Sequence, residues 1–279
     1  MARRASRKGS QDGSSGDRLL AVLPLFTVDD PEWTVEAAAR ELHVSATTAY
    51  RYFKRLTKAG LISPVSGASY ALGPAIIQMD RQIQISDPML NAARGVMTDL
   101  IQYAAEGSIV LLCRLFHDRV MCVHQVMGRG PQMPVSYERG RLMPLYGGAT
   151  ANIILAHLPT RTLKSLYAHD AAAVARAGLG KTWDEFRTNL ARLRREAVAI
   201  SKGEIDPGRV GIAAPIFDRD GAVLGSLSFV LPAPRADTPL IGRIASLTSA
   251  GAREIERVMN RESAPGQPSP ARLKIVRGR

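Results

Sequence analysis

The sequence is poor in cysteine and contains no long apolar run. Two cysteines among 279 residues do not make the disulfide framework that stabilises small secreted domains. The stretch of residues 142–160, which has no Asp, Glu, Lys or Arg, is interrupted by Pro144, two glycines and Asn152, which argues against a membrane-spanning helix. The first seventeen residues lack the apolar segment of a secretory signal. We therefore expect a soluble, cytoplasmic protein without a membrane partner.

Sequence signatures of common enzyme classes are missing as well. The chain has no G-x-S-x-G nucleophile elbow, no G-x-x-x-x-G-K-[ST] phosphate loop and no H-E-x-x-H zinc motif. Its five histidines are scattered along the chain. We therefore expect no enzymatic activity and no cofactor.

Acidic residues are outnumbered by basic ones, 25 to 37, which gives a net charge of +12. Such an excess often indicates a nucleic-acid partner. Residues 1–18 carry +3 and residues 261–279 carry +4, and we expect segments 1–17 and 261–279 to be disordered basic tails because they are rich in Gly, Ser, Pro and Arg. Residues 19–86 are neutral, with six charges of each sign. Net charge alone therefore does not locate a DNA-binding unit.

Residues 18–73 have the pattern of a winged helix-turn-helix. A helical pattern over 18–26 is flawed by Pro24, which should kink the helix or end it early. Thr34 is a good N-cap for a second helix, and Ser45 for a third that ends before Gly60. Two short β patterns then flank a turn at Ser66-Gly67. A basic second helix of a close pair, followed by a hairpin, is typical of this DNA-binding plan.

Charge is sorted within this region, with acids before Val44 and bases after it. On the third helix Ala49, Phe53 and Leu56 have the spacing of an inward face. The first turns would enter the major groove, and the later basic residues would contact phosphates. The DNA-binding candidates are Ser45, Thr47, Thr48, Tyr50, Arg51, Lys54 and Arg55. An ordinary three-helix packing unit with a solvated basic face is the alternative.

The rest of the chain predicts a linker helix over 74–86 and an α+β domain over 87–260. The domain's expected elements are a helix from the N-cap Asp87 to about Ala105, a hairpin of 109–116 with 119–126, a loop-to-helix segment over 140–159, a helix with a capping box at Thr182–Glu185, a hairpin of 210–217 with 222–231, and a helix over 238–259. Antiparallel strands with helices grouped around them are typical of the α+β class.

A binding site is indicated where Gly147, Gly148, Ala149 and Thr150 begin a helix. Unpaired backbone N–H groups and the positive end of the helix dipole would attract an anion there, and small side chains let it approach. Ser228 would add a hydroxyl from a neighbouring strand, and His124 a polar contact at the edge. The alternative is that the two glycines only make a tight loop.

Residues 34–62 resemble the DNA-binding region of the IclR family of bacterial transcriptional regulators. The matching positions are Thr47-Thr48, Tyr50-Arg51 and the Leu56…Gly60-Leu61 ending. Ser45-Ala46 replaces the family's usual Pro-Lys, and the wing at 67–70 lacks the usual basic residue. The resemblance implies a palindromic double-stranded operator bound by a homodimer or a dimer of dimers.

The resemblance continues over GEIDPGRVGIAAPIFDRDGAVLGSLSF and GRLMPLYGGATANIILAHLP, where Ala151-Asn152 replaces the family's usual Gly-Lys. It implies a GAF-like effector domain for small, often carboxylated metabolites. It also places Glu204 in the family's pattern, and Lys202, Gly211 and Val230 at pocket positions that are acidic, Cys and Ser in members binding small oxo-acids. These three residues favour a larger or partly aromatic acid as effector. We expect a regulator of this kind to control a catabolic operon.

Two rival functions remain open at this point. Cys113, His117, Cys122 and His124 lie in one predicted hairpin, where Cys113 and Cys122 would face each other and His124 would share their face. Such a group suits zinc, copper or redox sensing, although the same face reads as an apolar core. The other rival is a DNA-binding protein that uses its basic tails and has no regulatory ligand.

Overall fold

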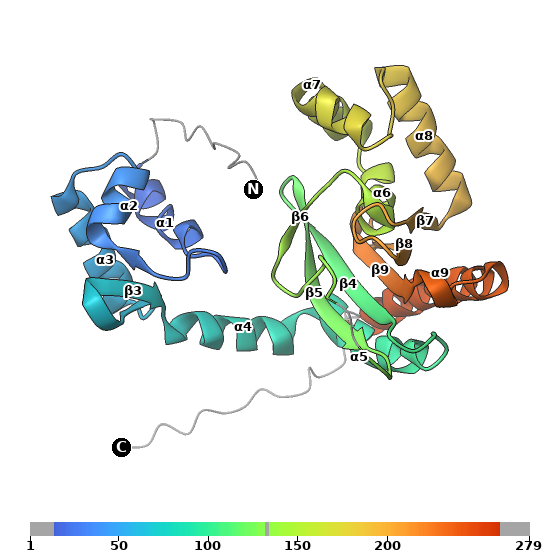
Figure 1. Cartoon of the computed structure of the whole chain (residues 1–279), viewed down its shortest axis with the longest axis horizontal. Coiled ribbons are helices and arrows are strands. Elements are labelled where there is room, and N and C mark those ends of the chain that lie inside the picture. The colour runs from blue at the N-terminus through green and yellow to red at the C-terminus, as the bar shows by residue number, and fades with distance from the viewer. Residues whose placement is uncertain (1–13, 132–133, 263–279) are drawn as a thin grey trace. The chain divides into compact units, whose positions relative to one another are not determined.

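The computed structural model describes residues 14–131 and 134–262 and is α+β (Figure 1). The chain divides between Ser86 and Asp87 into two compact units. No helix in the described ranges is long and apolar enough to cross a membrane. The predicted tails lie mostly outside the described residues, but α1 begins at Ser15 because Ser14 and Asp17 form a capping box. Ordered structure thus starts inside the segment expected to be the first tail.

The first unit is a winged helix-turn-helix. Its elements are α1 (Ser15–Leu20), η1 (Leu23–Leu25), β1 (Trp33–Thr34), α2 (Val35–Glu41), α3 (Ala46–Lys58), β2 (Ile62–Pro64), η2 (Ser66–Ala68), β3 (Ser69–Leu72) and α4 (Pro74–Ser86). Thr34 and Ser45 cap α2 and α3 as expected, and Gly60 takes φ +71° after α3. Pro24 limits the first helical pattern to α1 and a short 3₁₀ turn.

The core of this unit lies between α2, α3 and the wing. Ala49, Phe53 and Leu56 are buried as predicted, and Tyr52 joins them. The Phe53 ring meets the Tyr70 ring edge-on, with centroids 5.0 Å apart, which ties α3 to the wing. The strand β1 was not predicted; it pairs with β3 and makes the sheet three-stranded. The packing of these buried residues therefore determines which face of α3 is exposed.

The second unit is built on a six-stranded antiparallel sheet in the order β6-β5-β4-β9-β8-β7. Its elements are α5 (Pro88–Ile101), β4 (Ile109–Phe116), β5 (Arg119–Met127), β6 (Leu142–Pro144), α6 (Gly148–Ala156), α7 (Thr160–Arg176), α8 (Trp183–Glu196), β7 (Ala199–Lys202), β8 (Arg209–Phe217), β9 (Val223–Pro232), η3 (Ala233–Arg235) and α9 (Thr238–Glu262). The two predicted hairpins and the N-cap Asp87 are confirmed.

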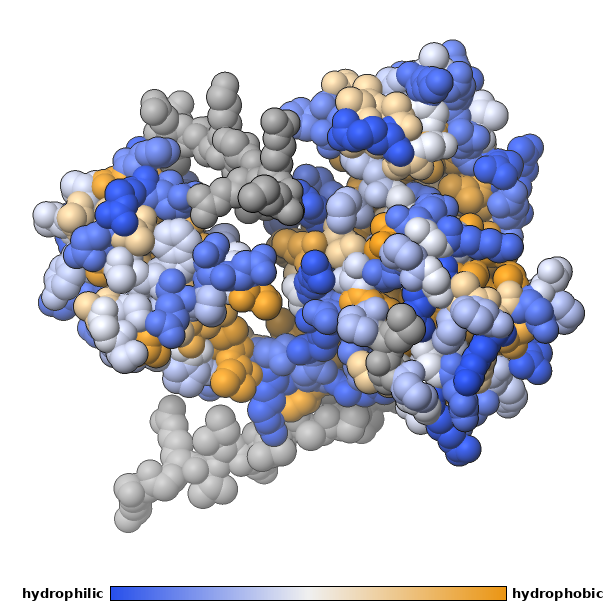
Figure 2. All heavy atoms as spheres, viewed as in Figure 1, coloured by the Kyte–Doolittle hydropathy of each residue, from blue (hydrophilic) through white to orange (hydrophobic). Residues whose placement is uncertain are grey.

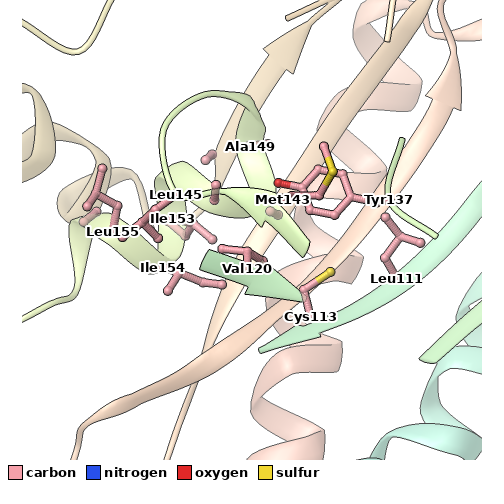
Figure 3. Packing of buried hydrophobic residues seen from close by; sticks show 14 of the residues in the cluster. Leu111, Cys113, Val120, Tyr137, Met143, Leu145, Ala149, Ile153, Ile154 and Leu155 are labelled. Carbon is pink, nitrogen blue, oxygen red and sulfur yellow. The ribbon is translucent and has the colours of Figure 1, made fainter. Parts of the chain in front are cut away.

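The sheet separates two hydrophobic clusters. On one face α5 and α9 cover residues such as Leu112 and Phe229. On the other face α6 lies against the sheet with all nine of its residues buried, in the cluster that Figure 3 shows. A helix whose residues are all buried must be enclosed by protein, which here is done by the sheet and by α8. The start of α6 is therefore held rigidly.

Several elements differ from the prediction. The helix α5 ends at Ile101 instead of about Ala105, and α7, β6 and β7 were not predicted at all. In α7 only Leu163 and Val174 are buried, so its sequence has a weak apolar stripe. Thr182 does cap α8, but the Glu185 carboxylate accepts from the Lys181 N–H, so the expected reciprocal capping box is not formed.

A β-bulge changes the face on which His124 lies. Cys113 pairs with Cys122 as predicted, but the register then shifts so that Leu112 pairs with His124. His124 is thereby placed on the α5 side of the sheet, opposite to the two cysteines. Burial, followed by the charges of Arg94 and Arg139, lowers the pKa of His124. The predicted convergence of His124 with the cysteines is therefore wrong.

Candidate functional sites

The first candidate site is the exposed face of α3. Thr47, Tyr50, Arg51, Lys54 and Arg55 are all exposed, and Tyr50 retains 56% of its accessible surface. The apolar residues of the helix point into the core, so the exposed face combines aromatic, hydroxyl and cationic groups on one rigid element. Such groups suit contacts with base edges and phosphates.

Ser45 and Thr48 have a capping role at the start of α3. The Ser45 hydroxyl accepts from the Thr48 N–H at 3.2 Å and donates to the Thr48 hydroxyl at 2.9 Å. Both residues remain partly accessible to solvent. Their first function is to satisfy an N–H group at the helix terminus, which also sets the angle at which α3 begins.

The second candidate site is a cavity where α6 meets the β7–β8 loop. It is lined by Tyr137, Gly148, Ala149, Thr150, Ser201, Gly203, Glu204, Ile205, Asp206, Arg209, Gly211 and Val230. Of the predicted effector residues it brings together Gly148, Ala149, Thr150, Glu204 and Gly211. The space left inside, about 30 Å³, has room for one or two water molecules. Little free space is therefore left in the cavity.

The backbone N–H groups at the start of α6 are not unpaired, contrary to the prediction. The Gly147 N–H donates to Asn152 Oδ1 at 3.1 Å, the Gly148 N–H to Glu204 Oε2 at 2.9 Å, and the Ala149 N–H to Ser201 Oγ at 3.0 Å. Side chains from the helix itself and from the β7 region satisfy them, as buried helix ends require. The Glu204 carboxylate thus occupies the position predicted for a bound anion.

Four predicted residues lie away from the cavity. His124 is on the other face of the sheet, and Gly147 is not part of the lining. Ser228 is fully buried and accepts from the Thr150 hydroxyl at 3.1 Å, so it ties α6 to β9. Lys202, placed in the pocket by resemblance, is exposed, because alternation along β7 turns Ser201 inward instead.

Sequence reasoning missed Arg209, Tyr137 and Asp206, three polar residues of the cavity wall. Arg209 is 5% exposed, and its Nη1 donates to the Gly107 carbonyl at 2.9 Å. Tyr137 is 4% exposed, and its hydroxyl has no hydrogen-bond partner among the described residues. In Figure 3 this hydroxyl is on the side of the ring that faces Ala149. A buried guanidinium and an unpaired hydroxyl are the kind of groups that a polar ligand requires.

The wall that carries Tyr137 is fastened to the β7–β8 loop. The Asp206 carboxylate accepts from the Ser136 N–H at 3.0 and 3.1 Å and from its hydroxyl at 2.6 Å. These residues are 70 positions apart. Asp206 therefore couples the position of the Tyr137 segment to the loop that holds Glu204.

The Cys/His metal site considered as a rival is not formed among the described residues. Within the described ranges no group of three or more His, Cys, Asp or Glu side chains is placed to hold a metal ion. Cys113 and Cys122 are free, fully buried thiols in the apolar cluster, and burial raises the pKa of Cys113. His117 lies in the tight β4–β5 turn and packs against Phe116. The cysteines behave as small apolar residues.

Two family models match the chain. The model described as the bacterial transcriptional regulator IclR C-terminal domain matches residues 85–257, and the IclR helix-turn-helix domain matches residues 15–66. Among curated proteins the chain is 22% identical over 226 residues to the HTH-type transcriptional regulator XynR of Escherichia coli, covering 80% of this chain and 88% of that protein. It is 20% identical over 255 residues to KdgR of the same species, covering 89% and 96%.

Solved structures share this fold. An IclR transcriptional regulator from Silicibacter sp. superposes with a TM-score of 0.75 at 23% identity, covering 92% of this chain and 98% of that chain. An IclR homologue from Microbacterium hydrocarbonoxydans, in complex with 4-hydroxybenzoate, gives 0.68 at 21% identity, covering 89% and 100%. With its winged helix and its six-stranded effector-type domain both matched by the family models, the chain belongs to the IclR family of DNA-binding transcriptional regulators and is not an enzyme.

Proposed function

We propose that this regulator senses a small organic acid in the cavity at the start of α6 and responds by changing its affinity for an operator. The observation that carries the proposal is the convergence of three groups on one cavity: the N-terminus of α6, the buried Arg209 guanidinium and the unpaired Tyr137 hydroxyl. The first two favour an anion, and the third favours a ligand with a second polar group. An aromatic hydroxy acid has both features, and a relative binds 4-hydroxybenzoate.

For DNA, we propose that α3 of each copy in a homodimer enters one half-site of a palindromic operator, through Ser45, Thr47, Thr48, Tyr50, Arg51, Lys54 and Arg55. Support for self-association comes from α4, where Ile77, Met79, Ile83 and Ile85 are each more than half exposed. Figure 2 shows apolar side chains at the surface along this helix. A dimer of dimers and a cytoplasmic location belong to the same proposal.

The proposal is tested by titrating the full chain with carboxylates while its DNA affinity is followed. An operator selected in vitro from random duplexes serves as the DNA, and 4-hydroxybenzoate and benzoate serve as probes. We expect one of the probes to raise the melting temperature and to change operator affinity. If neither probe changed the melting temperature or the operator affinity, the acid-sensing proposal would be contradicted.

Gly148→Val is expected to abolish acid binding while leaving operator affinity unchanged. Gly148 has φ +75°, which a β-branched residue adopts only with strain, and a β-carbon there would lie 2.7 Å from Ile205 Cγ1. The matched control is Gly178→Val, which has the same backbone problem at φ +69° but no atom within 4 Å. A normal ligand-induced melting shift in Gly148→Val would exclude the start of α6 as the anion site.

Tyr137→Phe is expected to weaken 4-hydroxybenzoate binding about fivefold without destabilising the ligand-free protein. The Tyr137 hydroxyl has no partner to lose, and a typical hydrogen bond contributes about 1 kcal/mol. The control is Tyr146→Phe, which removes a hydroxyl that donates to Asp170 at 3.3 Å and should lower the melting temperature. Calorimetric titration measures the affinity of both variants for 4-hydroxybenzoate, and thermal melting measures their stability. Unchanged affinity in Tyr137→Phe would mean that the hydroxyl does not contact the ligand.

A further inference from the structure

The side chain of Glu204 occupies the position that a carboxylate ligand would take. Glu204 Oε2 accepts from the Gly148 N–H, the first residue of α6, at 2.9 Å. The helix has nine residues, and its N-terminal end carries the positive pole of the dipole. Ser201 and Asn152 complete the arrangement with uncharged oxygens. Among these three acceptors Glu204 alone brings a negative charge.

The loop that carries Glu204 has the features of a movable cover. It runs between β7 and β8 and has glycines of positive φ near both ends, Gly203 at +66° and Gly208 at +76°. Glu204 is exposed, although its oxygen reaches Gly148. Ile205, the next residue, lies directly over Gly148, since a β-carbon at 148 would come within 2.7 Å of it. Glu204 and Ile205 therefore have to leave the start of α6 together.

One polar group of the cavity lacks a hydrogen-bond partner even with Glu204 in place. Tyr137 lines the cavity and is 4% exposed, and its hydroxyl is buried and has no partner among the described residues. A buried hydroxyl without a partner carries a desolvation cost that a ligand can recover. The remaining space of about 30 Å³ is too small for an aromatic acid until the loop moves.

We propose that Glu204 is a built-in competitor of the effector: its carboxylate holds the ligand-free cavity shut and is exchanged for the effector's carboxylate at the Gly148 N–H. The proposal rests on the proposed acid-binding function and adds how the site is regulated. Because one carboxylate replaces another, the Gly148 N–H has an acceptor both before and after the exchange. The displaced 203–208 loop, fastened through Asp206 to the Tyr137 segment, is the part that reports occupancy.

The test is calorimetric titration of 4-hydroxybenzoate into the full-length protein and into Glu204→Gln. Glutamine keeps the length of the side chain but loses the charge that the helix dipole attracts. We expect Glu204→Gln to bind 4-hydroxybenzoate about fivefold more tightly, because an exposed carboxylate at a helix terminus typically contributes up to about 1 kcal/mol, which corresponds to that ratio. The neutral analogue 4-hydroxybenzamide, which lacks the carboxylate that takes the place of Glu204, should bind both proteins more weakly than 4-hydroxybenzoate does.

A control variant separates exchange from general electrostatics. Glu138→Gln removes an exposed charge next to Tyr137 that is not part of the cavity lining. It should leave the affinity for 4-hydroxybenzoate within twofold of wild type. An equal gain in Glu138→Gln, or a lower melting temperature without any gain in Glu204→Gln, would overturn the exchange and leave Glu204 as a helix cap. Binding by none of the proteins would remove the acid-binding function itself.

Discussion

Arg51→Ala is expected to abolish sequence-specific operator binding while the protein remains fully folded. Arg51 is exposed on α3, in the turn that follows the N-cap and the first contact residues, and nothing in the core of the unit depends on it. A bidentate arginine–base contact contributes about 1–3 kcal/mol of discrimination. A homodimer on a palindrome loses two such contacts, so the affinity for operator should fall by roughly two to four orders of magnitude.

Lys54→Ala is the matched control for this prediction. Lys54 is exposed one turn further along α3, on the side expected to face phosphates. Its loss should weaken binding to all DNA about equally and lower the slope of log affinity against log salt by roughly one per contact. The measurement is fluorescence anisotropy with the selected operator and a scrambled duplex over a salt series. If Arg51→Ala weakened binding to both duplexes equally, Arg51 would be a phosphate contact.

Local chemistry explains why much of the fold could be predicted from the sequence. Thr34, Ser45 and Asp87 cap helices because their side-chain oxygens reach an N–H two or three residues ahead, a relation visible in any single segment. The inward positions of α3 follow from helical spacing in the same way. Both hairpins of the effector unit are marked by their turns.

The candidate cavity was only half predicted, because its remaining groups meet through tertiary contacts. The glycines at the start of α6 indicate that another group approaches the backbone closely there. Nothing near them in sequence shows that this group is the Glu204 carboxylate, from 56 residues away. Tyr137 and Arg209 belong to no recognisable sequence motif. They are notable because they are buried, and burial is a property of the folded unit. The β-bulge that moves His124 arises from one extra residue in β5, which alternation of apolar residues does not detect.

Phe53→Ala is expected to unfold the DNA-binding unit selectively. Phe53 is fully buried between α2, α3 and the wing, with its ring against Tyr70. Removing a buried phenyl ring usually costs about 3–5 kcal/mol through lost transfer energy and the cavity left behind. A unit of this size has a small core, and its total stability is typically about 5–10 kcal/mol, so most of it should be lost. Operator binding would be lost with the folded unit, while acid binding to the second unit persists.

Hydrogen exchange followed by mass spectrometry measures the two units separately in the intact chain. In Phe53→Ala we expect faster exchange in peptides from residues 14–86 and unchanged exchange in those from 87–262, because the two units have separate hydrophobic clusters. Tyr50→Ala is the control: it removes an aromatic side chain of similar size from the exposed face of the same helix and should leave exchange in both units unchanged. Faster exchange throughout the Phe53→Ala chain would mean that the units unfold as one cooperative structure, and the effector signal would then have to pass through shared stability instead of a change in conformation.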